Sequence, residues 1–281
     1  MNDQIINNGR WGLRQRTIFI IFICSVFLFS LILTGIFIDM DRMSVNLAAR
    51  NHTPSLTHLF GTDWLGRDML VRTLKGLTFS FFVGIMAALL STLIALVLSL
   101  IGSLHRILDG VVVWLIDLFL SVPHLVVLIL ISFVLGGGYK GVIIALAVTH
   151  WPSLTRLLRA EIMQIKKNPY VEVSKKLGKS RIWIVKNHFL PHLIPQLLVG
   201  FILLFPHVIL HEAAITFLGF GLPQEQPAIG IILSESMQYL STGMWWLAVF
   251  PGLSLLILVV LFDLIGRCVR KLVDPFDGQM I

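Results

Sequence analysis

Six apolar stretches alternate with polar segments along this chain of 281 residues. A helix that crosses a bilayer needs about 20 predominantly apolar residues. The stretches of suitable length predict transmembrane helices at about 17–38, 77–101, 111–135, 141–158, 192–218 and 244–265. Pro123 is expected to kink the third of these helices. The pattern therefore predicts an all-α, polytopic membrane protein with about six transmembrane helices.

The polar segment between the fourth and fifth predicted spans, residues 160–191, is expected to form a helical hairpin. Asn168 is a favourable helix cap, and Gly178 suits the left-handed residue that ends a helix. Ser180 can cap a second helix, and Pro191 is expected to break it. Apolar residues recur along that second helix at Ile182, Val185 and Phe189. A capped hairpin with one apolar face predicts a docking element.

Two other polar segments are predicted to lie on the opposite side of the membrane. The first, residues 39–75, contains Gly and Asp residues typical of turns and helix caps, and Arg67 is placed to pair with Asp63. The simplest interpretation is a turn that sets the second span. The second, residues 219–243, is expected to contain a short helix near 230–240.

The composition is typical of a membrane protein, and the distribution of charge predicts on which side of the membrane its termini lie. Hydrophobic residues make up 56% of the chain and charged residues only 13%, against about 25% charged residues in a soluble domain. Of the 22 Lys and Arg residues, 16 fall in the N-terminal tail, the turn near residue 106, the segment from Arg156 to Lys186 and the C-terminal tail. Because positive residues concentrate in cytoplasmic segments, both termini and the hairpin are expected inside. The net charge of +7 then matches anionic membrane lipid, and no nucleic acid partner is predicted.

The chain is expected to have three parts. Residues 1–76 comprise the N-terminal tail, the first transmembrane helix and an outer segment. Residues 77–270 form a core of five transmembrane helices that carries the hairpin, and residues 271–281 form a cytoplasmic tail.

Motifs for catalysis or nucleotide binding are incomplete in this sequence. Gly178 begins a GKS triplet, but a phosphate-binding loop needs a glycine at position 173, where Val173 stands. His211 and Glu212 form an HE pair, but no second histidine follows at zinc-protease spacing. The chain is therefore predicted to be no enzyme and to bind no cofactor of its own.

The hairpin fits a spaced pattern: E-A-A, three residues, G, nine residues, then I-x-L-P. The residues that match it in register are Glu172, Gly178, Leu190 and Pro191. Val173 and Ser174 replace the two alanines, and His188 replaces the isoleucine. This pattern resembles the EAA loop of permease subunits in binding-protein-dependent ABC importers.

Three further stretches narrow the resemblance. The outer segment matches GTD-x-x-GRD at Gly61, Asp63, Gly66, Arg67 and Asp68. The stretch 211–221 is similar to E-A-x-x-S-F-L-G-x-G, and Asp274-Pro275 lies in the tail. Together these motifs span about residues 58–275, and they resemble the second permease subunit of dipeptide, oligopeptide and nickel importers.

The resemblance implies a type I ABC importer permease fold in a bacterial inner membrane. It also implies a heterodimer with a homologous second permease and an external solute-binding protein. One or two cytoplasmic ATPase subunits, which use ATP and Mg²⁺, would dock on the hairpin. Glu172, Gly178, Leu190 and Pro191 would then form the coupling site.

Histidines in the predicted spans bear on the solute. His207 and His211 lie four residues apart on one helical face, Glu212 adjoins them, and His150 lies in the fourth span. Ionisable residues within a membrane usually face the bundle interior or a solute path. Imidazole is a good ligand for nickel and cobalt, and the nickel branch of the family resembles this chain in having such histidines. The favoured solute is therefore nickel, cobalt or a metal–chelator complex, with His207 and His211 as transient ligands.

Three alternatives stay open at this stage. The solute is a di- or oligopeptide, and the histidines only form hydrogen bonds between helices. A stand-alone secondary transporter would need internal inverted repeats. An intramembrane enzyme would use His207, His211 and Glu212 as a metal site.

Overall fold

The computed structural model describes residues 12–273. The N-terminal tail up to residue 11 and the Asp274-Pro275 motif lie outside this range. The long helices within it are α1 Leu13–Phe37, α2 Met69–Leu104, α3 Arg106–Ser121, α4 His124–Val134, α5 Gly138–Ile165, α8 Leu190–Phe217 and α10 Trp246–Val273. The short ones are η1 Met40–Met43, η2 Leu47–Ala49, α6 Pro169–Lys176, α7 Arg181–Ile184, η3 Val185–Phe189, α9 Ile229–Met237 and η4 Leu240–Thr242.

The expected number of spans is confirmed, with one change in shape. Five helical runs are long and apolar enough to cross a membrane, and α3 with α4 makes a sixth if the pair is one span. These two helices meet at 98°, so the predicted kink is in fact a break at residues 122–123. Proline lacks an N–H and disfavours helical backbone in the residue before it, which accounts for the interruption at Pro123.

The expected break at Pro191 is wrong. Helix α7, the π-helical turn η3 and α8 join into one helical run from Arg181 to Phe217. Pro191 is the second residue of α8 and directly follows the wider π turn. The wider π turn before α8 accommodates the proline ring and its missing N–H inside the helical run.

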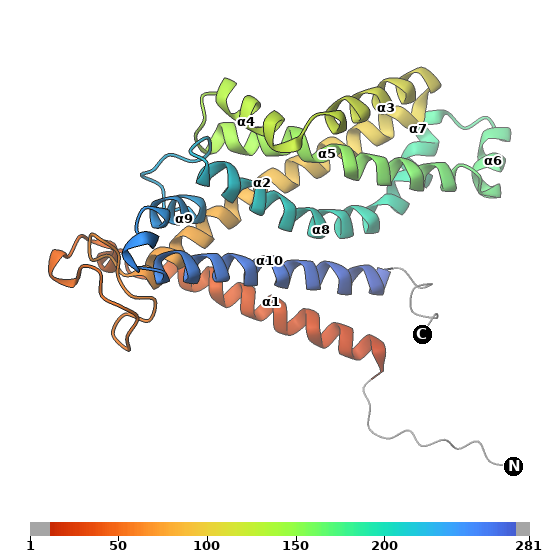
Figure 1. Ribbon diagram of the computed structural model, residues 1–281. Helices are drawn as coiled ribbons and strands as arrows, with labels where there is room; N and C mark the ends of the chain where they lie inside the picture. The colour runs from red at the N-terminus through yellow and green to blue at the C-terminus, as the bar shows by residue number, and fades with distance from the viewer. Residues whose placement is uncertain (1–11, 274–281) are drawn as a thin grey trace, which may run out of the picture.

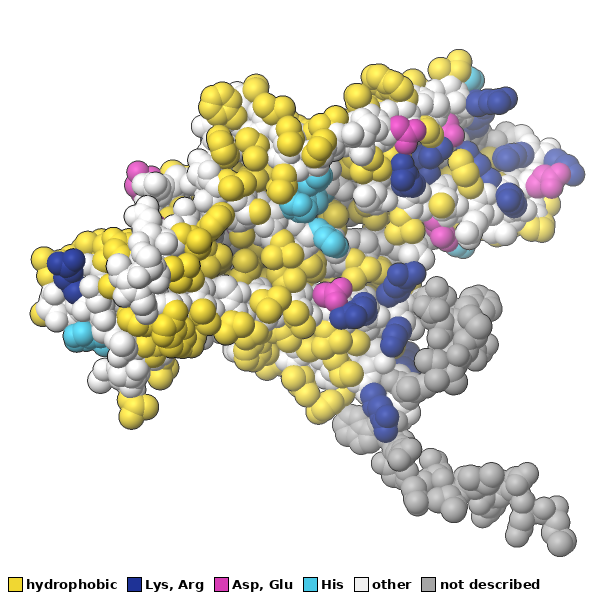
Figure 2. Space-filling model, viewed as in Figure 1, with side chains coloured by type: hydrophobic (Ala, Val, Ile, Leu, Met, Phe, Trp, Pro, Cys, Tyr) yellow, Lys and Arg dark blue, Asp and Glu magenta, His cyan; other side chains and the backbone are white. Residues whose placement is uncertain are grey.

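The bundle has two distinct ends, which Figure 1 shows. Helices α6 and α7 project at one end, which also holds the start of α1 and the end of α10. The outer segment between α1 and α2 folds at the other end, beside α9. The Lys and Arg side chains visible in Figure 2 gather mainly at the end with α6 and α7.

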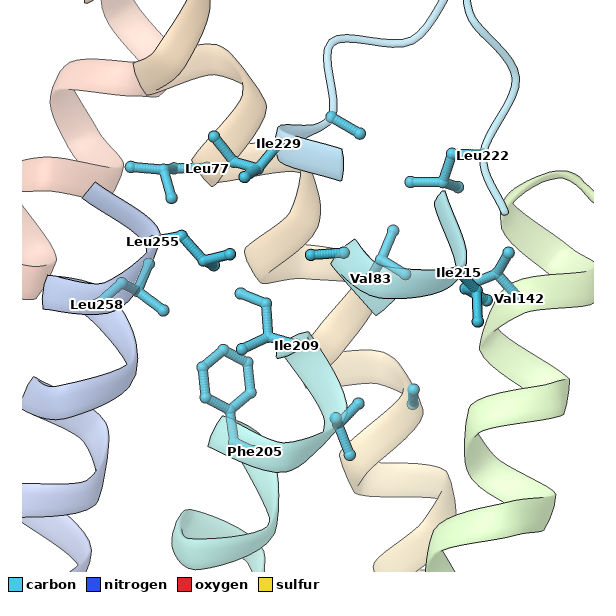
Figure 3. Packing of buried hydrophobic residues seen from close by; sticks show 14 of the residues in the cluster. Leu77, Val83, Val142, Phe205, Ile209, Ile215, Leu222, Ile229, Leu255 and Leu258 are labelled. Atoms are coloured by element: carbon cyan, nitrogen blue, oxygen red, sulfur yellow. The ribbon is translucent and has the colours of Figure 1, made fainter. Parts of the chain in front are cut away.

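Helix α8 is central and packs against α2, α5, α9 and α10. Figure 3 shows its Phe205 and Ile209 directed towards Leu258 of α10, and its Ile215 close to Val142 of α5. All of these side chains are fully buried. By contrast, many large apolar side chains remain exposed on the outside of the bundle (Figure 2), as expected where lipid replaces water.

Candidate functional site

The hairpin is built by a complete helix-ending motif. Gly178 has φ +75°, and its N–H donates to the carbonyl of Lys175 while the Lys179 N–H donates to that of Ser174. These two bonds satisfy the last carbonyls of α6, and the left-handed backbone favours glycine. The Ser180 hydroxyl accepts from the Trp183 N–H and caps α7 as predicted. The predicted Asn168 cap acts through its backbone carbonyl instead of its side chain.

The hairpin exposes both charge and apolar surface. Glu172 lies in the first turn of α6 and pairs with Lys176 at 3.1 Å, with both side chains more than two-thirds exposed. An exposed pair of this kind stabilises a helix by under about 1 kcal/mol. The large side chains of Leu177 and Ile182 are also exposed, whereas Ile184 and Phe189 are buried and attach the hairpin to the bundle.

Two of the three departures from the family pattern, Ser174 and His188, contact each other. His188 Nε2 lies 2.9 Å from the Ser174 hydroxyl, which also donates to the carbonyl of Tyr170. The hydroxyl proton is therefore used, and His188 is the donor towards Ser174. This bond joins the two helices of the hairpin where the family pattern has alanine and isoleucine. The remaining matched residues, Leu190 and Pro191, begin α8 behind the hairpin.

A basic cavity of about 630 Å³, which the sequence did not predict, lies beside the hairpin. It is lined by the turn between α2 and α3, the end of α5, and residues of α6, α7 and η3. Its charged lining residues are Arg106, Asp109, Lys166, Lys175, Lys179 and Arg181. The Lys166 ammonium donates to the Ser103 carbonyl, and burial lowers its pKa from the ordinary value.

The outer motif is organised around the buried carboxylate of Asp63. This carboxylate accepts hydrogen bonds from the backbone N–H groups of Leu65 and Arg67 at 2.9 Å. It also accepts from Arg67 Nε at 2.6 Å and from an Arg72 guanidinium nitrogen at 3.1 Å. The predicted pairing of Asp63 with Arg67 is confirmed. Arg72 also donates a hydrogen bond to the carboxylate of Glu235 in α9 and forms an ion pair with it, a partner that the sequence pattern did not predict.

The other residues of the motif shape the same turn. Gly66 has φ +74°, and a Cβ there would meet the Asn46 carbonyl oxygen at 1.8 Å. Gly61 has φ +71°, and a Cβ there would lie 2.7 Å from the His52 carbonyl oxygen. Asp68 caps α2 by accepting from the Leu70 and Val71 N–H groups. The motif therefore fastens the outer segment to the start of α2, as the simpler interpretation predicted.

The histidines are arranged differently from the predicted pair. Ring nitrogens of His124, His150 and His211 all lie within 4.8 Å of one another. The side chain of His207 is exposed and is not one of these three, and its backbone carbonyl lies 2.8 Å from His211 Nδ1. Figure 2 shows histidine side chains together near the middle of the visible face. The member that sequence reasoning left without a role is His124, which follows the break at Pro123.

Glu212 does not join the histidines. Its side chain is fully buried and accepts from the Thr216 hydroxyl at 3.0 Å, one turn further along α8. The same hydroxyl oxygen lies 3.3 Å from the Leu222 N–H and accepts from it. Glu212 thus helps to hold the chain after α8 against its last turn. Its place in a solute path stays a prediction.

A bundle of long apolar helices with a polar hairpin at one end defines a multi-pass membrane protein. Residues 91–275 match the family described as binding-protein-dependent transport system inner membrane component. This match covers well over half of the chain, so the chain belongs to that family. It is a permease component of an ABC importer with the type I permease fold.

Named relatives extend the match beyond the family region. The chain is 31% identical over 252 residues to a dipeptide transport system permease protein of Bacillus subtilis, covering 89% of this chain and 79% of the relative. It is 33% identical to an oligopeptide transport system permease protein of the same organism, covering 87% and 82%. It is 31% identical to a probable D,D-dipeptide transport system permease protein of Escherichia coli, covering 85% and 80%.

Proposed function

We propose that this chain forms one half of the membrane pathway of an importer for short peptides. The proposal rests on the similar proteins: they are named as dipeptide and oligopeptide permeases, and the match covers about four-fifths of their length. The nickel or cobalt cargo expected from the sequence has only the membrane histidines in its favour. No relative named above is a metal permease, so peptides are the better supported solute class.

The other half of the pathway would be a homologous second permease, and an external binding protein would deliver the peptide. Family membership supports both partners. Cytoplasmic ATPase subunits would supply ATP hydrolysis with Mg²⁺, and this chain would bind no nucleotide. Both termini would lie in the cytoplasm, in agreement with the gathering of Lys and Arg at the hairpin end (Figure 2).

The hairpin is the proposed contact with the ATPase. Glu172, Leu177 and Ile182 present one carboxylate and two apolar side chains to the outside. Because α7, η3 and α8 are one helical run, a displacement of the hairpin is transmitted directly into the central helix. Such a rigid link suits an importer in which ATP-driven movement switches the access of the pathway.

Uptake by reconstituted vesicles tests the proposal. The chain is co-purified with its second permease and ATPase subunits, and uptake of a labelled dipeptide is compared with uptake of labelled nickel. The expected result is ATP-dependent peptide uptake that does not require metal. ATP-dependent nickel uptake without peptide uptake would contradict the peptide assignment, and transport without an ATPase subunit would contradict the importer mechanism.

A further inference from the structure

Three imidazole rings from three different helices converge midway along the bundle. His124 is the first residue of α4, His150 lies in α5 and His211 lies in α8. Their ring centroids are separated by 4.4 Å for His124 and His150, 4.6 Å for His124 and His211, and 5.1 Å for His150 and His211. Ionisable side chains within a membrane cost free energy, and they usually mark a functional site.

The hydrogen bonds of the group fix which ring nitrogens carry lone pairs. His150 Nδ1 lies 2.9 Å from the Leu146 carbonyl, and His211 Nδ1 lies 2.8 Å from the His207 carbonyl. A carbonyl oxygen only accepts, so both Nδ1 atoms carry the proton in this arrangement. His150 Nε2 has a lone pair but lies 3.3 Å from His211 Nδ1, so an ion that binds both residues replaces this contact and needs a lone pair on the His211 nitrogen that it meets. His124 Nε2 is buried and has no hydrogen-bond partner. Backbone carbonyls that orient imidazoles in this way are typical of the surroundings of metal ligands.

We propose that His124, His150 and His211 bind one divalent transition-metal ion. Ring nitrogens within 4.8 Å of one another place a central ion at most about 2.8 Å from each. A metal–imidazole bond is about 2.0–2.1 Å, so inward movements of under about 1 Å by each ring complete the site. Side-chain rotation supplies such a shift without any change in the helices.

The ligand set selects the class of ion. Three neutral imidazoles suit zinc, nickel, cobalt and copper, whereas magnesium and calcium prefer oxygen ligands. Three protein ligands also leave a fourth position open to water or to a solute group. The proposal concerns a bound ion and does not depend on which solute crosses the membrane.

Binding would link three helices across the broken span. The break at residues 122–123 separates α3 from α4, and His124 lies on the α4 side of it. An ion held by this group would fix the start of α4 to α5 and α8.

Metal binding to the purified full-length chain tests the proposal directly. The chain is prepared in detergent with an affinity tag that contains no histidine, and is titrated with Co²⁺, Ni²⁺ or Zn²⁺ alone. We expect one equivalent per chain by equilibrium dialysis, with visible Co²⁺ absorption bands that report nitrogen ligands. We also expect His124→Gln, His150→Gln and His211→Gln each to weaken binding by more than about tenfold.

Two control variants separate the cluster from other histidines. His192→Ala removes an exposed imidazole from the same helix α8, at its cytoplasmic end, and should bind as the unmodified chain does. His207→Ala should also retain binding, because the exposed His207 side chain is not one of the three converging rings and alanine keeps the backbone carbonyl that contacts His211. Elution as a single species in size-exclusion chromatography confirms that each variant is folded.

Several results would overturn the proposal. A folded unmodified chain that binds no Co²⁺, Ni²⁺ or Zn²⁺ would do so, and would leave the group as a hydrogen-bonded cluster. Binding that survives His124→Gln but is lost in His207→Ala would instead assign the ion to the pair on α8. Peptide uptake is measured separately, so failure of the metal site leaves the proposed function intact.

Discussion

Removal of the Asp63 carboxylate by Asp63→Ala is the sharpest test of how the outer segment is held. The carboxylate is fully buried and receives four hydrogen bonds, two of them from the guanidinium groups of Arg67 and Arg72. The Arg72 side chain is only 7% exposed, and without Asp63 it keeps the single carboxylate of Glu235. Breaking a buried pair by removing one partner costs about 3–5 kcal/mol, because the other charge stays buried.

The upper part of that range is not expected. Arg67 is 18% exposed, so water can replace part of what it loses. Arg72 also lies over the ring of Trp64, with its guanidinium carbon 5.5 Å from the ring centroid, and this cation–π contact remains. We therefore expect a loss of about 3–4 kcal/mol in the free energy of opening the outer segment.

Glu172→Ala is the matched control, because it removes another carboxylate that pairs at i, i+4. Its partner Lys176 is 75% exposed, so the expected loss is under about 1 kcal/mol. Hydrogen exchange of the Asn46 and Thr62 amides, which donate to backbone carbonyls within the outer segment and keep these acceptors in both variants, measures the opening. Equal exchange in the two variants would refute the argument from burial.

Three further predictions concern the hairpin and the packing of α9. Glu172→Gln should reduce ATP-coupled uptake far more than Lys176→Gln, as measured in vesicles that contain the ATPase. Equal losses would show that Glu172 acts only through its ion pair with Lys176. Gly178→Ala should destabilise the hairpin by about 1–2 kcal/mol in hydrogen exchange, because φ is +75° there, whereas Gly178→Asn should be milder. Gly230→Ala should lower thermal stability by about 1–3 kcal/mol, because its Cβ would lie 2.5 Å from the Ala213 carbonyl oxygen. Gly252→Ala should leave stability unchanged, because the nearest atom to its Cβ would be 3.8 Å away.

The local rules of helix capping explain why much of the hairpin follows from sequence. Gly178 and Ser180 act through their own backbone and the residues within five positions of them. The same holds for Asp63 with Arg67 and for Asp68 as the cap of α2. Proline is less decisive, because its effect depends on the turn before it. The π turn at 185–189 lets Pro191 stand inside a continuous helix, whereas Pro123 stands at a break.

The sequence by itself determined the helical class, the number of long apolar runs, the hairpin and the family motifs, since these depend on composition and on spacing along one chain. Only the tertiary structure decided which distant residues meet. It brought Glu235 to Arg72 across 163 positions, and His124 and His150 to His211 in place of His207. The physical reason is that helical periodicity fixes the face of a side chain on its own helix. The side chain that it meets depends on how α2, α4, α5, α8 and α9 pack together.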